Sequence, residues 1–460
     1  MGHRTRTRPD RDLLQQQFVA RFPVLVGVDA AKQKHTFAVR GPDGVVGPSE
    51  DVPLTRLTLD AWRAALHARF PGVRAEQILI GIEFAGGLGA TLTHYFRQHG
   101  YTVVAVPAKA AKQTREGSLS GRNKTDRVDA RHICTTLARG LYVRYPALRS
   151  PIAELKVLTM SYHKLSVERA RLKNRLRGLL DLVWPELPRQ ANPKKATLPA
   201  LVTRWPLPQD LLASSPRTVQ EYVRTISGGK HQAAWIRRLL REARASLGLT
   251  DALPERRLEL QHLMARHELL DGQLGELAER IEALVEQCPE ARLLDTVPEL
   301  GPIGAATIVA ELGDPAAFEH PDQWLKLAGL HLAQHQTGQT DGRKRIAKQG
   351  RPLLRRQLYL LAGRWSLKRG LYADDHRALR AKGFAKTKAV CTLARRLVPV
   401  LFAIVRTGEP FDRDRFVANR RRREEAPMPT SATPKRARRA GVKVAASARR
   451  VKQIGAKATK

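Results

Sequence analysis

The sequence predicts a mixed α/β domain, followed by two long helices and a mainly helical C-terminal domain. Three observations favour this fold class. Short apolar runs that end in an acidic residue occupy the first part of the chain, as expected for buried strands of an α/β sheet. Two later segments repeat apolar residues at alternating spacings of three and four, the period of paired helices. Near residue 293, a glycine-containing turn leads into an alanine-rich segment, which is typical of two helices joined by a short turn.

The predicted α/β domain covers residues 23–145 and follows a basic N-terminal arm, residues 1–22. One apolar run ends at Asp29 and another ends at Glu83, so each would deliver a carboxylate to the edge of the sheet. Further strands are predicted at residues 35–39, 45–46 and 102–106, with helices at about 57–70 and 88–99. A three-strand meander followed by alternating strands and helices is the layout of the RNase H-like fold. We therefore expect that fold here, with acids gathered at the sheet edge.

Two more acids, Asp126 and Asp129, lie three residues apart at the start of a predicted helix, and this spacing places them on one face. Together with Asp29 and Glu83 they form a set of oxygen ligands of the kind that binds Mg²⁺ or Mn²⁺. A pair of such ions can clamp the attacking and leaving oxygens of a phosphodiester, so the pattern is nuclease-like. Asp126 has a second interpretation, because an acid behind Thr125 would also stabilise the helix N-terminus.

The charge of the chain indicates the class of its partner. The sequence has 81 lysine and arginine residues against 43 aspartate and glutamate residues, a net charge of +38. A positive field of this size attracts polyanions and makes affinity depend on salt through counterion release. So large a basic surplus is hard to explain by solubility alone, so nucleic acid is favoured over a membrane surface. A membrane span is not expected either, because no stretch approaches the ~18–20 uninterrupted apolar residues that it needs.

Nothing in the sequence indicates export. The first twelve residues are polar and arginine-rich, without an apolar signal region. The three cysteines, Cys134, Cys288 and Cys391, are too scattered for a disulfide framework or a zinc site. We therefore expect a cytoplasmic, nucleoid-facing protein.

Two segments, residues 151–185 and about 257–287, have a heptad pattern with leucine in most seam positions. Arg169 interrupts the first pattern and His267 interrupts the second. The helices could form a coiled coil, either in cis as a hairpin or across a homo-oligomer, or they could belong to an ordinary helical bundle. The insertion between them, at about 186–255, is rich in proline, arginine and tryptophan and carries no motif with a chemical meaning.

The predicted C-terminal domain covers residues 290–410, after the paired helices of residues 151–287. Its opening, residues 294–304, resembles a helix-hairpin-helix, in which a glycine turn exposes backbone N–H groups to phosphate oxygens. A plain turn between two helices explains the same residues equally well. Residues 420–460 hold 14 lysine and arginine residues and 2 acids, so residues 411–460 should form a basic tail that is disordered until it meets nucleic acid.

Several cations are candidates for contact with nucleic acid. Arg122 and Lys124 precede the paired acids, where they would either touch phosphate or be solvated. A dense basic face lies in the C-terminal domain, and its density favours contact with a DNA or RNA backbone. Its residues are Arg343, Lys344, Arg345, Lys348, Arg351, Arg355 and Arg356.

The acids and several later residues lie in an ordered set of short motifs. These are GVDAAK at 27–32, EFAGG at 83–87, RNKTDRVDA at 122–130, KNRL at 173–176, LAGL at 327–330, QTG at 336–338, RIAKQG at 345–350 and LRRQLY at 354–359. Together, over about residues 24–405, they resemble the DEDD-type transposases of bacterial insertion sequences, the insertion-sequence one-ten family. Each motif is weak by itself, whereas the ordered set is specific.

That resemblance implies a RuvC-like N-terminal domain whose acids hold divalent metal, a coiled coil that mediates dimerisation, and a C-terminal transposase domain. Members of the family are recombinases that excise and insert their element, guided to DNA by a structured RNA from the element's own ends. By position, the ligands of Mg²⁺ or Mn²⁺ would be Asp29, Glu83, Asp126 and Asp129. The family's nucleophilic serine, which becomes covalently joined to DNA, is replaced here by Thr337.

Two other functions stay open at this point. A junction-resolving nuclease would use the four acids and metal without a covalent hydroxyl. A nucleic-acid-binding protein that has lost catalysis would need neither. The chain has no serine between Ser246 and Ser366, so no nearby serine could take over the covalent role from Thr337.

Overall fold

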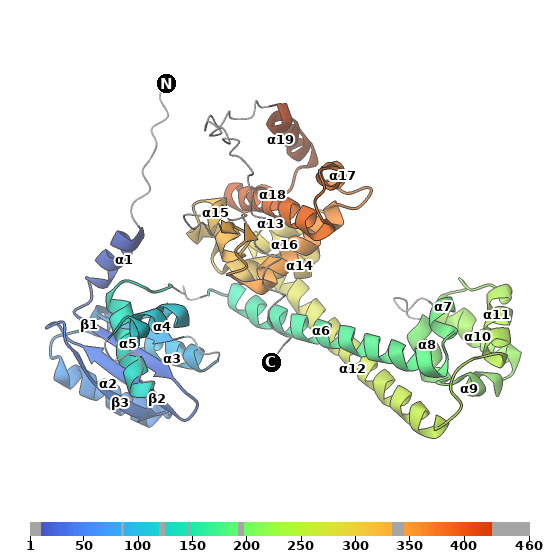
Figure 1. Ribbon diagram of the computed structural model, residues 1–460, viewed down its shortest axis with the longest axis horizontal. Helices are drawn as coiled ribbons and strands as arrows, with labels where there is room; N and C mark the ends of the chain where they lie inside the picture. The colour runs from blue at the N-terminus through green and yellow to red at the C-terminus, as the bar shows by residue number, and fades with distance from the viewer. Residues whose placement is uncertain are drawn as a thin grey trace, which may run out of the picture.

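The computed structural model describes residues 11–83, 87–118, 125–144, 148–191, 197–333 and 345–425. They form a mixed α/β sheet near the N-terminus and a mostly helical remainder (Figure 1), which confirms the predicted fold class at that level. None of the described helices is long and apolar enough to cross a membrane.

The sheet has five strands, which are β1 (Val24–Ala30), β2 (Lys34–Arg40), β3 (Val46–Pro53), β4 (Ile78–Glu83) and β5 (Thr102–Val106). They lie in the order β3-β2-β1-β4-β5. β1 pairs antiparallel with β2, and β2 pairs antiparallel with β3. β4 lies parallel to both β1 and β5. A meander of three strands is thus extended by two strands whose carboxyl ends point the same way as that of β1.

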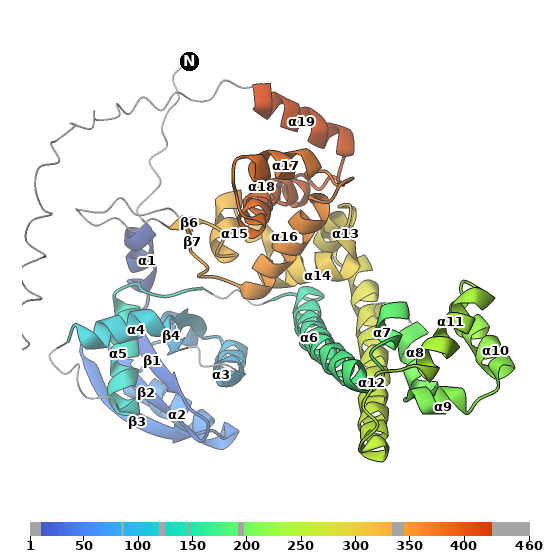
Figure 2. The same cartoon turned by 45° about the vertical axis from the view of Figure 1, so that its right-hand side comes forward.

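Helices cover both faces of this sheet, with α4 and α5 on one face (Figure 2). The helices are α1 (Arg11–Val19), α2 (Arg56–Arg69), α3 (Gly87–Gln98), α4 (Ala108–Glu116) and α5 (Asp126–Ala138). Successive side chains of a strand alternate between faces, so β1 contributes to both apolar layers. Val26 and Val28 pack with residues of α2 and α3, whereas Leu25 packs with residues of α1, α4 and α5.

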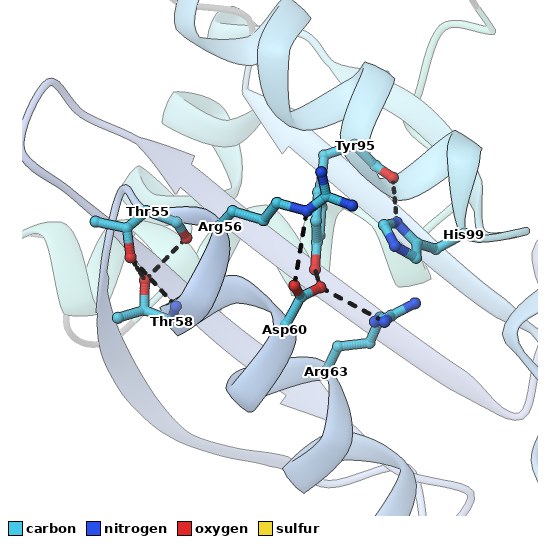
Figure 3. Close-up of polar contacts among 7 residues, drawn as sticks. All are labelled: Thr55, Arg56, Thr58, Asp60, Arg63, Tyr95 and His99. Atoms are coloured by element: carbon cyan, nitrogen blue, oxygen red, sulfur yellow. Dashed lines mark hydrogen bonds and ion pairs between the residues drawn. The ribbon is translucent and has the colours of Figure 1, made fainter.

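Polar contacts join α2 and α3 (Figure 3). Thr55 caps α2 by accepting a hydrogen bond from the backbone N–H of Thr58 at 3.2 Å. The Tyr95 hydroxyl on α3 donates to the Asp60 carboxylate on α2 at 2.6 Å. Burial and this hydrogen bond raise the pKa of Tyr95 to about 12, and the same bond lowers the pKa of Asp60. A neutral tyrosine and an ionised aspartate therefore connect the two helices across the ordinary pH range.

Gly27 lets α5 lie directly on β1. A Cβ atom at this position would lie 2.3 Å from the backbone nitrogen of Cys134 and 2.5 Å from the carbonyl oxygen of Ala130. Both distances are shorter than real Cβ contacts, and both neighbours are backbone atoms that cannot swing aside. Gly27 and Asp29 share one face of the strand. The contact therefore fixes where α5 crosses β1, two residues before Asp29.

The two long segments are helical, as predicted, and form α6 (Ile152–Val183) and α12 (Leu253–Glu286). They pack against each other within one chain as an antiparallel hairpin (Figure 1). The residues that interrupt the heptads meet in this seam. Arg169 donates to Asp271 at 2.8 Å, and Nδ1 of the buried His267 lies 3.4 Å from the same carboxylate. The structure thus shows the pairing in cis, and a homo-oligomer stays a prediction.

The insertion forms a small helical lobe at the far end of the hairpin (Figure 1). Its helices are α7 (Leu187–Gln190), α8 (Thr197–Arg204), α9 (Pro208–Leu212), α10 (Pro216–Ser227) and α11 (Ala233–Arg244). The lobe shares one apolar core with the ends of α6 and α12, in which Trp184 and Trp205 are buried. Its two ends return to the same place, because the backbone N–H of Leu249 donates to the carbonyl of Leu182 at 2.9 Å.

The C-terminal part packs around a second large apolar core, which α6 and α12 also enter. Its elements are α13 (Pro289–Asp295), α14 (Gly301–Leu312), α15 (Pro321–Leu327), β6 (Leu332–Ala333), β7 (Arg345–Ile346), α16 (Pro352–Trp365), α17 (Ala373–Ala381), α18 (Lys386–Thr407) and α19 (Arg413–Glu425). The core includes Trp324 and Trp365, both fully buried.

One expectation about the tail needs correction. Residues 413–425, part of the predicted disordered tail, form helix α19. The Phe416 ring lies 5.5 Å from that of Trp365 and 5.8 Å from that of Tyr372, and Arg420 lies 3.0 Å from the Asp375 carboxylate. An aromatic anchor and an ion pair therefore hold a segment that its composition alone placed in the tail. Residues 426–460 lie outside the described part of the chain.

Candidate active site at the sheet edge

Asp29 and Glu83 lie at the carboxyl ends of neighbouring parallel strands, Asp29 as the last residue but one of β1 and Glu83 as the last residue of β4. In the β1–β4 register, Val28 lies opposite Ile82, so the next residue on each strand is one of the two acids. Alternation along β1 places Asp29 on the same face as Gly27, and alternation along β4 does the same for Glu83 and Gly81. That face is the one covered by α5, because Cβ atoms at Gly27 and Gly81 would meet α5 atoms. The two acids therefore share one face at one edge of the sheet.

The first turn of α5 brings the other two acids to this edge. Thr125 caps the helix by accepting from the backbone N–H of Val128 at 3.3 Å, so Asp126 and Asp129 both belong to its first turn. Carboxylates in this turn face the positive end of the helix dipole. Helix capping is thus a real role of this turn, and it is compatible with a further role for the acids.

Polar residues on β2 and β3 are aligned with Asp29 across the sheet, and one of them also contacts the first turn of α5. Thr36 on β2 lies opposite Asp29, and Asp51 on β3 lies opposite Thr36. The Thr36 hydroxyl donates to Asp51 at 2.8 Å, and Arg127 of α5 lies 3.5 Å from the same carboxylate. Hydrogen bonds from Lys34 and Thr36 lower the pKa of Asp51, so it is ionised when these partners hold it. The sequence analysis did not identify these residues, because they are aligned by the pairing register of the three strands, which no local motif indicates.

Arg115, on the last turn of α4, forms an ion pair with one of the acids, Asp129. Its guanidinium donates to Oδ1 of Asp129 at 2.7 Å, and the side chains of both residues are 18% exposed. The hydrogen bond with Asp129 raises the pKa of Arg115 most, and the charge of Glu83 contributes in the same sense. Arg115 therefore lies within the field of two of the four acids. An arginine in so basic a chain gave no signal at the level of sequence.

The four carboxylates are chemically suited to bind a divalent cation, but they do not converge on a common position. Carboxylate oxygens are the ligands that Mg²⁺ and Mn²⁺ prefer. Within the described residues, however, no three aspartate, glutamate, histidine or cysteine side chains lie close enough together to hold a metal ion. Asp126 is exposed, and Asp129 is engaged by Arg115. The arrangement is thus an acid edge whose ligands do not fit a metal ion as they stand.

The predicted basic face divides into two groups. Arg351 donates to the carbonyl of Glu311, and Arg355 donates to that of Ala328 at 2.9 Å, so both are tied to backbone. Arg345, Lys348 and Arg356 are exposed and available to a polyanion. Five other predicted site residues lie outside the described part of the chain, namely Arg122, Lys124, Thr337, Arg343 and Lys344.

The predicted hairpin of helices consists of α13, α14 and the turn between them. Glu299 and Gly301 have φ values of +66° and +69°, and Arg364 donates to the Glu299 carbonyl at 2.6 Å. No side chain caps α14, whose first residues line a cavity of about 470 Å³ together with His163 and Arg356. Uncapped backbone N–H groups beside an exposed guanidinium suit a phosphate oxygen. The geometry is compatible with the helix-hairpin-helix interpretation.

Comparison with known proteins identifies relatives along most of the chain. A model of DEDD-type IS110 transposases matches residues 26–185, and a model described as the transposase IS116/IS110/IS902 family matches residues 291–376. A 44.8 kDa protein of insertion element IS116 from Streptomyces clavuligerus is 27% identical over 403 residues, which cover 84% of this chain and 96% of that protein. A 43.6 kDa protein of insertion element IS110 from Streptomyces coelicolor is also 27% identical, over 84% of this chain and 94% of that protein.

A more partial similarity concerns a protein described by its activity. A pilin gene-inverting protein from Moraxella bovis is 26% identical over 146 residues, which cover 30% of this chain and 45% of that protein. The insertion lobe, from α7 to α11, lies outside the residues matched by both family models.

Proposed function

The chain belongs to the IS116/IS110/IS902 family of transposases, and we propose that it is a DNA recombinase that cleaves and rejoins strands at the ends of an insertion sequence. The observation that carries this proposal is the arrangement of the four acids. Two lie at the carboxyl ends of neighbouring parallel strands, and two occupy the first turn of the helix that crosses the same face.

The N-terminal domain is proposed to be an RNase H-like domain of the RuvC type. Three antiparallel strands extended by two parallel ones, in the order β3-β2-β1-β4-β5, support this assignment. Its acids Asp29, Glu83, Asp126 and Asp129 would hold Mg²⁺ or Mn²⁺. Such ions, when bound, stabilise charge on a phosphate that undergoes substitution. To serve as a ligand, Asp129 would have to give up its ion pair with Arg115.

The hydroxyl of Thr337 is proposed as the nucleophile. In that step the bond from its Oγ to phosphorus forms, one bond from phosphorus to a deoxyribose oxygen breaks, and the hydroxyl proton passes to a base. A free hydroxyl attacks poorly, so the step needs a base or a neighbouring cation. Gly338 supports the assignment, because a residue without a side chain lets the backbone approach a phosphate closely.

DNA at the element ends and target, and a structured guide RNA, are the proposed partners. The net charge of +38 supports binding of polyanions. Phosphate contacts are proposed for Arg122, Lys124, Arg343, Lys344, Arg345, Lys348, Arg351, Arg355 and Arg356. The working form is proposed to be a homo-oligomer, a dimer or tetramer, located at the bacterial nucleoid.

The test is strand cleavage by the full chain on a supercoiled plasmid that carries the DNA flanking its reading frame, with RNA transcribed from that DNA. Asp29→Asn should abolish cleavage in Mg²⁺ while circular dichroism and the melting temperature stay unchanged. Glu50→Gln is the matched control, because this exposed acid lies on β3 one residue from Asp51, on the opposite face of the sheet. Full cleavage by Asp29→Asn rejects the proposed site.

The same reaction separates recombination from its alternatives. A covalent protein–DNA adduct, seen as a shifted band on a denaturing gel, supports the recombinase. Metal-dependent cleavage without an adduct supports a junction-resolving nuclease instead, and binding without cleavage supports a protein that has lost catalysis. The threonine at position 337, where the family has serine, is the feature that makes this separation necessary.

A further inference from the structure

We propose that Arg115 is a positioning residue that holds Asp129 in the metal-free chain and competes with a divalent cation for its carboxylate. The inference rests on the acid site proposed above. It adds Arg115, on α4, to the four acids, and proposes that the ion pair between Arg115 and Asp129 must break before Asp129 can bind a metal ion. Arg115 belongs to none of the motifs that define the acids.

The geometry of the ion pair is the first support. Arg115 and Asp129 come from α4 and α5, which pack together on one face of the sheet (Figure 2). Their 2.7 Å contact is largely shielded, because each side chain is 18% exposed. An interaction shielded in this way is screened less by salt than one at the open surface. The pair therefore connects the end of α4 to the first turn of α5, the next helix in the sequence.

The position of Arg115 on its helix is the second support. It lies in the last turn of α4, where a cation also interacts favourably with the helix dipole. Its own carbonyl accepts a hydrogen bond from the Ser118 hydroxyl at 2.7 Å, which fixes the backbone at the end of the helix. The guanidinium is thus held beside Asp129 by the end of α4.

The arrangement of the acids is the third support. Carboxylates that share one edge repel each other unless a positive charge lies among them. Arg115 supplies that charge, since it bonds Asp129 and interacts with the charge of Glu83. In doing so it occupies an oxygen of Asp129, and the described residues contain no cluster of three metal ligands. Arg115 therefore places a positive charge beside the acids and holds one of their oxygens in an ion pair, which a cation would have to displace in order to bind Asp129.

A competition of this kind has two opposite consequences for a variant that lacks the guanidinium. Without a cation, Asp129 loses its partner and the acids repel, so the fold is less stable. With a divalent cation, Asp129 is free to coordinate, so binding is tighter. A merely structural arginine would give the first effect and not the second.

The experiment measures Mn²⁺ binding by titration calorimetry and thermal unfolding, with EDTA or with Mn²⁺, for the full chain. Arg115→Met should bind Mn²⁺ about fivefold more tightly than the wild type, as expected when one competing ion pair is removed. Its melting temperature should be lower in EDTA, and Mn²⁺ should raise it more than it raises that of the wild type. Lys112→Met is the matched control, because Lys112 lies one turn earlier on α4 and pairs at 3.5 Å with Glu116 instead.

The outcomes separate this inference from the function on which it rests. Equal Mn²⁺ affinity in Arg115→Met and wild type, or an equal gain in Lys112→Met, overturns the competition while leaving the metal site intact. Absence of Mn²⁺ binding in the wild type and Arg115→Met alike overturns the metal site and the competition with it. In EDTA, adding Asp129→Asn to Arg115→Met should restore stability, because the unpaired charge is removed. No restoration contradicts the pairing itself.

Discussion

Arg169 and His267, one on each long helix, contact the same carboxylate, that of Asp271. Each interrupts an otherwise apolar seam, and the two share this partner at one level of the hairpin. A polar residue at a seam position specifies register, because a slipped pairing would bury it without a partner. The three residues therefore fix how α6 and α12 slide against each other.

This cluster makes the hairpin sensitive to acid. Burial lowers the pKa of His267, while Asp271 acts in the opposite sense, and Nε2 of the ring has no hydrogen-bond partner among the described residues. A lowered pKa means that the folded chain resists a proton that the unfolded chain accepts below about pH 6.5. The stability from a neutral His267 is therefore present above that pH and lost as the pH falls. Urea unfolding at pH 7.5 and pH 5 should show a smaller loss of stability for His267→Leu than for the wild type. Equal losses would mean that His267 does not take part.

The contact at Gly27 predicts a large effect from one methyl group. Gly27→Ala should lower the free energy of unfolding by about 3 kcal/mol, the upper end of what overpacking usually costs, because the new Cβ would overlap backbone atoms of α5. Gly178→Ala, at an exposed helical position with no neighbouring atom within 4 Å, should instead stabilise the chain by about 0.5–1 kcal/mol. Denaturant melts of the two variants test this contrast. A Gly27→Ala variant as stable as the wild type would show that α5 can move away.

The proposed role of Thr337 as the nucleophile leads to a prediction about two substitutions. Thr337→Ala should abolish any protein–DNA adduct, and Thr337→Ser should preserve or increase it, since serine keeps the hydroxyl without the methyl that restricts χ1. The adduct is measured on denaturing gels after reaction with labelled DNA. Its persistence in Thr337→Ala would move the nucleophile elsewhere, with Thr340 and Tyr359 next in order. Failure of both the wild type and Thr337→Ser to form an adduct would exclude the covalent mechanism for this chain.

The tail predicts a change in salt dependence. Residues 426–460 carry 10 lysine and arginine residues and no acids. Their deletion should reduce the slope of log affinity against log salt, by about 0.9 for each phosphate of duplex DNA that the tail neutralises. Filter binding at several salt concentrations measures this slope. Deletion from residue 412 should also destabilise the chain, because Phe416 no longer packs on Trp365 and Tyr372. An unchanged slope would mean that the tail does not contact phosphate.

Features that depend on one continuous segment of the chain could be predicted from the sequence. Asp29 and Glu83 could be placed at strand ends because each follows a buried apolar run, and the two long helices could be found from their heptads. Features that depend on a distant partner could not be predicted. Arg115 and Asp129 are 14 residues apart, and nothing in either segment identifies the other as its partner.

Two further failures have a physical reason. The tail was judged by average composition, which hides a single anchor such as Phe416. The insertion lobe has no regular apolar period over its whole length, because it consists of five short helices that share a core with the hairpin. Its longest helices, α10 and α11, are separately amphipathic, and shorter windows would have found them.

The shared core of the lobe and the hairpin has a mechanical consequence. The lobe cannot swing freely, since Leu176 and Leu263 of the long helices pack in the same cluster as its own residues. At the opposite end, Leu155 and Ile281 are packed into the core of the C-terminal helices. With 32 residues at about 1.5 Å each, α6 is about 48 Å long, so a tilt of about 5° at one end moves the other by about 4 Å. Because both ends of the hairpin are packed into cores, a displacement of the lobe should move the C-terminal helices as well.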